Sequence, residues 1–168
     1  MIKKAILTAL CLSLSVMCIS ETAHGFEAIY ECNEQLLQKF PNVEAIKKQF
    51  GDGAKWQEST MPSIHDANLE LQLKNMEHPG IEIRTLGYIL EGEDRFFITL
   101  ADVNKAGFVE FLGIDVGSVR EDVVKKFGEP QQIDGNELIY HDEDEFTFIK
   151  FVVENGIVTE MRLNNYLD

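Results

Sequence analysis

The sequence predicts an α+β fold of two tandem repeats, each a short helix (or helices) packed on a small antiparallel β-sheet. The helical stretch "VEAIKKQFGDG" over residues 43–53 returns as "VREDVVKKFGEP" over residues 119–130, about 77 positions later. Segments with strand-like alternation, separated by turn residues, follow each helix. Three residues of the last strand recur at a constant spacing, since Glu82, Arg84 and Tyr88 return as Glu160, Arg162 and Tyr166. The first repeat is therefore expected over residues 26–92 and the second over residues 93–168.

Residues 1–25 have the pattern of a secretory signal peptide. Lys3 and Lys4 precede an apolar run, and small residues follow it at Ala23 and Gly25. The run covers about 15 residues, fewer than the roughly 20 of a membrane-spanning helix. Met17 before Cys18 disfavours a lipoprotein site. We expect cleavage after Gly25, no membrane insertion afterwards, and a periplasmic or secreted protein.

The elements of the first repeat follow in order. An additional helix is expected from Ala28 to Lys39, with Cys32 on its apolar face as a small buried hydrophobe rather than a reactive thiol or an intermolecular bridge. Cys32 is the only cysteine after residue 25, so it has no intramolecular disulfide partner. Asn42 then caps a short helix that ends at Gly51. Strands are expected at 54–59, 68–73 and 81–90, and a hairpin joins 94–100 to 108–114.

In the second repeat, Ser118 and Glu121 have the spacing of a capping box, which predicts a helix from Ser118 to Phe127. Gly128 and Pro130 supply its stop. Strands are expected at 137–141, 146–153 and 157–167, as a three-stranded meander with acidic residues 142–145 in its first turn.

The charge balance limits the partners. The chain has 15 Lys and Arg against 29 Asp and Glu, a formal net charge of −14. Such a surface repels phosphate backbones and anionic lipid headgroups, so binding to nucleic acid is not expected. A basic protein partner suits this field, and so does the simpler interpretation that the charge serves solubility.

No motif predicts catalysis or a cofactor. The three histidines after residue 25 lack zinc-site spacing, and no nucleophile elbow or phosphate loop occurs. The contiguous acids of "HDEDEF", residues 141–146, lack the alternating spacing and glycine of a calcium loop and read as a solvated hairpin tip. We therefore expect neither a metal site nor a cofactor.

Strand alternation suggests a binding face. Ile81 and Ile83 point to one side of their strand, and Arg84 and Tyr88 point to the other. In the last strand, Ile157, Thr159, Met161 and Leu163 are expected on one face and Val158, Glu160 and Arg162 on the other. Aromatic residues and Arg anchor interfaces, whereas the alternative is that these charges form cross-strand pairs while the aromatics cover a helix. With the acidic tip included, the candidate partner-binding residues are Trp56, Arg84, Tyr88, Asp142, Asp144, Phe148, Lys150, Arg162 and Tyr166.

The frame "GIDVGSVREDVVKKFGEP", followed by "LIYHDEDEFTFIKFVVENGIVTEMRL", resembles two groups of small exported bacterial modules. One is the β-lactamase-inhibitory-protein family, and the other is the SmpA/OmlA family of outer-membrane assembly lipoproteins. The resemblance covers residues 113–163 and implies a scaffold that binds a protein through a sheet face. The chain has neither the disulfides of the first family nor a convincing lipidation cysteine, so neither specific function is carried over.

The preferred hypothesis is an exported, non-enzymatic module that binds a protein partner on a face of its antiparallel sheet. A second hypothesis is an acidic periplasmic inhibitor or immunity protein that blocks a basic hydrolase with the tip at 141–145. A third is a small enzyme with an unrecognised site, for which Cys32 is the one distinctive nucleophile.

Overall fold

The computed structural model describes residues 27–66 and 68–166. The predicted signal peptide lies outside the described residues. Among those described, no helix combines the length and the apolar character needed to cross a membrane.

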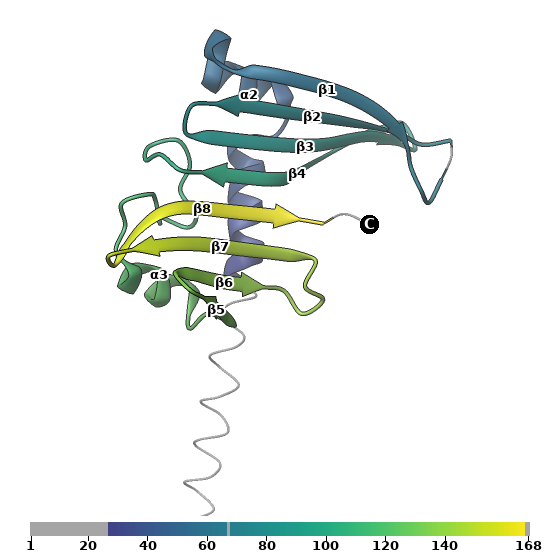
Figure 1. Cartoon of the computed structure of the whole chain (residues 1–168). Helices are drawn as coiled ribbons and strands as arrows, with labels where there is room; N and C mark the ends of the chain where they lie inside the picture. The colour runs from purple at the N-terminus through teal and green to yellow at the C-terminus, as the bar shows by residue number, and fades with distance from the viewer. Residues whose placement is uncertain (1–26, 67, 167–168) are drawn as a thin grey trace, which may run out of the picture.

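The protein is α+β with a dominant sheet, as Figure 1 shows. A helix over residues 27–39 is followed by α2 (Val43–Phe50), a 3₁₀ turn η1 (Gly51–Gly53) and four strands. After a long loop, α3 (Arg120–Phe127) leads into four more strands. The strands are β1 (Lys55–Pro62), β2 (Glu70–His78), β3 (Ile81–Leu90), β4 (Glu93–Val103), β5 (Gln132–Asp134), β6 (Glu137–His141), β7 (Thr147–Glu154) and β8 (Ile157–Asn165).

One antiparallel sheet contains all eight of these strands, in the order β1-β2-β3-β4-β8-β7-β6-β5. The two groups of four meet where β4 pairs with β8, with Ala101 opposite Leu163 and Asp102 opposite Arg162. Strand β3 is the third strand after α2, whereas β8 is the fourth strand after α3. These two strands do not occupy equivalent positions in the two halves, although Glu82, Arg84 and Tyr88 of β3 recur as Glu160, Arg162 and Tyr166 in and just after β8. The order of strands therefore does not confirm a tandem repeat.

The helices cover one face of the sheet. In Figure 1 the helix over residues 27–39 runs behind the sheet, across β4, β8 and β7, and no helix crosses the near face. Residues of this helix, including Cys32 and Leu36, are buried against the inward side chains of the strands. A row of cross-strand partners forms the centre of this core: Met76, Ile83, Ala101, Leu163, Ile149 and Tyr140.

Both short helices form where the sequence predicts them. Asn42 caps α2 by accepting a hydrogen bond from Ala45 N through its side chain, at 2.9 Å. The capping box predicted for α3 is wrong, because the Ser118 hydroxyl instead accepts from Asp115 N at 3.0 Å. The helix consequently begins at Arg120, with Val119 as an N-cap that supplies no side-chain bond.

The hairpin predicted over 94–114 is also wrong in its second half. Residues 104–119 form a loop whose apolar side chains Val109, Phe111 and Ile114 are buried. Lys39 Nζ and Gln49 Nε2 donate hydrogen bonds to Phe108 O, at 2.8 and 3.2 Å. These bonds hold the loop against the helices, so β4 is free to pair with β8 instead.

Candidate binding face

The face of the sheet opposite the helices, called here the open face, contains two regions of different chemistry. Antiparallel sheets commonly leave one face in water. Near β4, β8, β7 and β6 the open face carries a row of charged side chains. Toward the far ends of β1–β4, beside the β1–β2 connection, it carries an apolar groove.

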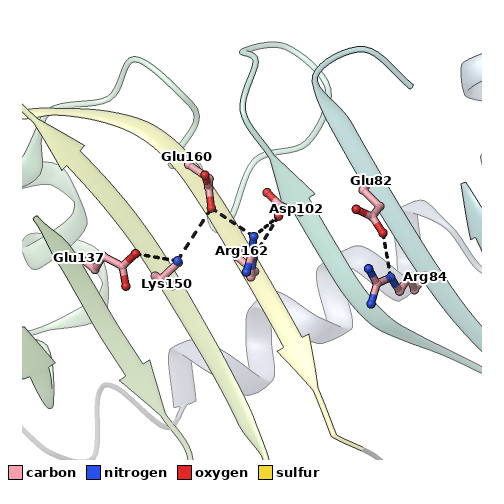
Figure 2. A network of polar contacts seen from close by, with 7 residues as sticks. All are labelled: Glu82, Arg84, Asp102, Glu137, Lys150, Glu160 and Arg162. Carbon is pink, nitrogen blue, oxygen red and sulfur yellow. Dashed lines mark hydrogen bonds and ion pairs between the residues drawn. The ribbon is translucent and has the colours of Figure 1, made fainter. Parts of the chain in front are cut away.

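The charged ladder consists of Glu137, Lys150, Glu160, Arg162 and Asp102 (Figure 2). Lys150 Nζ lies 2.8 Å from Glu137 Oε1 and 4.0 Å from Glu160 Oε1. Arg162 lies 3.5 Å from Glu160, and its Nε donates to Asp102 Oδ2 at 3.0 Å. The ladder therefore links β6, β7, β8 and β4 through side chains as well as through the backbone.

Arg162 shows how strongly the ladder is coupled. Burial alone lowers the pKa of Arg162, but the hydrogen bond and charge of Asp102, with smaller contributions from Glu160 and Glu137, outweigh burial and raise that pKa above its ordinary value. Two carboxylates already occupy this guanidinium. Arg162 and Lys150 thus form the cross-strand ion pairs that are the alternative to a binding face.

The apolar groove is defined by side chains of β2, β3 and β4 and has a volume of about 590 Å³. Tyr88 and Phe97 form a stacked pair in it, with ring centroids 5.8 Å apart and an interplanar angle of 21°. The register places Leu73 opposite Leu86, and Leu86 opposite Phe97. The principal lining residues are Leu71, Leu73, Leu86, Tyr88, Phe97 and Leu100.

Polar groups border this groove. Arg84, Tyr166 and His65 belong to its lining, and in the part of the chain that the structure describes no Asp or Glu does. Arg84 Nε donates to Glu82 Oε1 at 2.8 Å, and more than half of the Arg84 side chain is exposed. Figure 2 shows this pair apart from the charged ladder, on the neighbouring strand β3.

The structure brings several candidate residues together. Arg84, Tyr88 and Tyr166 line the groove, and Phe148 lies beside Tyr166 with ring centroids 6.3 Å apart. Lys150 and Arg162 lie in the charged ladder.

Trp56 does not share this face. It stands opposite the fully buried Met76 and packs partly buried against the core on the helix-covered side. Lys47 Nζ lies 5.6 Å from the Trp56 ring centroid, so α2 shields the indole. The expectation that Trp56 belongs to an exposed face with Arg84 is therefore wrong.

Val158 also lies on the side opposite to its prediction. The pairing of β7 with β8 shifts between Val152 and Val153, so two successive pairs are Val152 with Glu160 and Val153 with Val158. This irregularity turns Val158 into the core, while Met161 and Leu163 stay buried as expected. Ile157 and Thr159, which were grouped with Met161, are consequently not buried with it.

The acidic tip forms a tight turn between β6 and β7. Asp142 holds this turn, since its N–H donates to Thr147 O and its Oδ2 accepts from Thr147 N at 3.0 Å. Asp144 is exposed. Among the described residues, no group of three or more His, Cys, Asp or Glu side chains is arranged to hold a metal ion.

Cys32 is fully buried, which confirms that it is a core residue. Burial raises the pKa of its thiol well above the ordinary range, and Glu31 adds to this effect. A nucleophilic cysteine needs the opposite, a lowered pKa and access to substrate.

Sequence reasoning missed the leucines of β2 and the aromatic Phe97 as surface residues. Alternation does place Leu71 and Leu73 on one face, but apolar residues are ordinarily assigned to the covered face. The signal that could have corrected this is Met76, an apolar residue of opposite parity on the same strand, which is the one that is buried.

Comparisons of the chain with protein-family models, with curated proteins and with solved structures found no match.

Proposed function

We propose that the protein is an exported, non-enzymatic binding module that holds a protein partner on the open face of its sheet, centred on the apolar groove. The observation that carries this proposal is the clustering of Leu73, Leu86, Tyr88 and Phe97 on a face that none of the described helices covers. Contiguous exposed apolar surface with a polar border is characteristic of interaction sites.

The residue types support a protein as the partner. Interfaces are anchored by aromatic residues and Arg in a desolvated centre, surrounded by a polar rim. Here Tyr88, Phe97 and Tyr166 supply aromatic surface, and Arg84 stands at the border. The charged ladder beside the groove would act as rim, because its members already satisfy one another.

A binding role rather than catalysis is supported by Cys32. This candidate nucleophile is buried behind the sheet and its thiol is held protonated. Export remains a proposal that rests on the pattern of residues 1–25.

We also propose that the two halves descend from one duplicated unit of a short helix and four strands. The start of α2 at Val43 and of α3 at Arg120 preserves the 77-residue spacing of the two stretches. The mirrored strand order on either side of the β4–β8 junction supports the same origin.

The binding proposal is tested by capture with the purified protein from envelope and secreted extracts, identification of the captured protein, and calorimetry with that partner purified. Leu86→Asn is expected to weaken binding by about tenfold or more, since it places an amide in the centre of the apolar contact. Ile89→Asn is the matched control, because Ile89 lies on the same strand, is exposed, and is outside the groove.

Two further variants separate the alternatives. Arg162→Ala probes the charged ladder, and the double variant Asp142→Ser/Asp144→Ser probes the acidic tip. Binding that survives Leu86→Asn but is lost with the tip variant and at high salt would overturn the groove proposal in favour of an acidic inhibitor.

A further inference from the structure

The groove differs in charge from the chain that contains it. Asp and Glu outnumber Lys and Arg by 29 to 15 in the sequence, yet none of the carboxylates among residues 27–66 and 68–166 lines the groove. Its lining includes Arg84 and His65 instead. The local field at this apolar surface is therefore less negative than the field of the whole protein.

Arg84 retains hydrogen-bonding capacity toward a ligand. A guanidinium has five N–H donors in a planar fork. Among the described residues, the one hydrogen bond of this group joins Nε to Glu82, which leaves the terminal nitrogens at the border of the groove. Arg162 contrasts with it, since Asp102 and Glu160 both contact its terminal nitrogen.

A carboxylate suits these terminal nitrogens better than any other common side chain. Charge-assisted bonds between Arg and carboxylate are short and commonly bidentate, and they gain strength beside apolar surface that excludes water. A Lys or Arg of a partner would gain no counter-charge from the described residues of the groove lining, because none of them is an acid.

We infer that the groove receives an apolar segment of the protein partner that carries an Asp or Glu side chain, with its apolar residues on Leu73, Leu86 and Phe97 and its carboxylate on Arg84. This inference rests on the proposed protein-binding function and specifies the chemistry of the contact. It is opposite in sign to the basic partner that the net charge of −14 favours. Long-range charge governs the rate of approach, whereas the groove selects by local contact.

A random peptide library displayed on phage tests the inference. It would be selected on the purified protein expressed from the full chain, with counter-selection on Leu86→Asn. The selected sequences are expected to combine aliphatic or aromatic residues with Asp or Glu. Synthetic peptides with amidated ends then measure affinity without a terminal carboxylate.

A double-mutant cycle isolates the Arg84 contact. Replacing the peptide's acid by its amide, or Arg84→Gln in the protein, is expected to weaken binding by about tenfold in each case. Combining the two changes should weaken binding little further, because both remove the same ion pair. Arg95→Gln is the matched control and should leave affinity within about twofold. Like Arg84, Arg95 pairs at 2.8 Å with a Glu two residues earlier on its strand, but it does not line the groove.

Three results would overturn the inference. The first is selected peptides rich in Lys or Arg, and the second is an affinity that Arg84→Gln leaves unchanged. The third is a failure to enrich any peptide. This failure would overturn the inference even if dodecanoate, added as a probe, shifts the groove resonances in NMR spectra. If Leu86→Asn abolishes binding of the captured partner while Arg84→Gln does not, the proposed function stands and the inference fails.

Discussion

On the open face of the sheet, the side built by β6, β7 and β8 pairs its charges internally, whereas the side built by β2 and β3 leaves apolar surface and an arginine uncovered. Lys150 and Arg162 each contact two carboxylates, and Arg84 contacts one. The ladder residues are also the less exposed, with 16% of the Lys150 side chain accessible against 57% of that of Arg84. Charged groups that already pair with one another order a sheet but form few new contacts with a partner. Apolar surface bordered by an arginine with free N–H donors can form many such contacts.

The largest expected effect comes from removing an aromatic residue of the core behind the charged ladder. Phe151 is fully buried, and its ring centroid lies 5.0 Å from that of Phe127 and 6.0 Å from that of Tyr140. Phe151→Ala should lower the free energy of unfolding by about 3–5 kcal/mol, measured by urea denaturation. Phe148→Ala, on the open face of the same strand, should cost less than about 1.5 kcal/mol; equal losses would contradict the assignment of the two faces.

A smaller effect, on the same covered side, is expected from alkaline pH. The raised pKa of Cys32 means that the folded state keeps its thiol protonated while the unfolded chain ionises above roughly pH 8.5. The stability contributed by this group is thus complete below that pH and decreases as pH rises, by about 2 kcal/mol at pH 10. Cys32→Ala should show a shallower alkaline loss than the parent, whereas parallel curves from pH 8 to 10 would exclude the effect.

Breaking the ladder should cost less than breaking the core but more than breaking an isolated pair. Asp102→Ala leaves Arg162 with one carboxylate in a partly buried site, and we expect a loss of about 1–2 kcal/mol. Glu82→Ala removes the exposed partner of Arg84 and should cost less than about 0.5 kcal/mol. Thermal unfolding of the two variants, and of Asp102→Ala with Arg162→Met in a double-mutant cycle, measures this difference in stability. Equal losses from Asp102→Ala and Glu82→Ala would show that the ladder contributes nothing beyond an exposed pair.

The smallest effect on stability is expected in the groove. Leu86 is only half-buried, so Leu86→Asn should change the free energy of unfolding by no more than about 0.5 kcal/mol. The same variant should reduce the fluorescence of the apolar, anionic dye ANS bound to the native protein. Unchanged dye fluorescence together with a large loss of stability would mean that the groove is part of the folding core and not a binding surface.

Local signals predicted local structure well. The Asn42 cap, the glycines that end α2 and α3, and the turns between β6, β7 and β8 all depend on contacts within a few residues. The capping box at Ser118 failed because Asp115, three residues earlier, competes for the same hydroxyl. A short motif therefore indicates a helix more reliably than it fixes the first residue.

The remaining features depend on contacts distant in sequence. Which face of β2 is covered depends on how the sheet packs against the helices, and within β2 only the buried Met76 indicates that face, against the two leucines Leu71 and Leu73. The β4–β8 junction joins residues about 60 positions apart, so β4 could not be assigned its true neighbour from its own pattern. Arg84 and Tyr88 could be selected as candidates by residue type, whereas their separation from Trp56 required the sheet itself.

The position of β8 has a consequence for the order in which the molecule is completed. This strand is the last of the described elements in sequence, yet it occupies the middle of the sheet, between β4 and β7. Without β8, strands β1–β4 and β5–β7 share no pairing with each other, and β4 and β7 each have an unpaired edge. Joining these two groups into one sheet requires β8, and its pairing with β4 closes a separation of about 60 residues, so the single sheet forms only once this strand is in place.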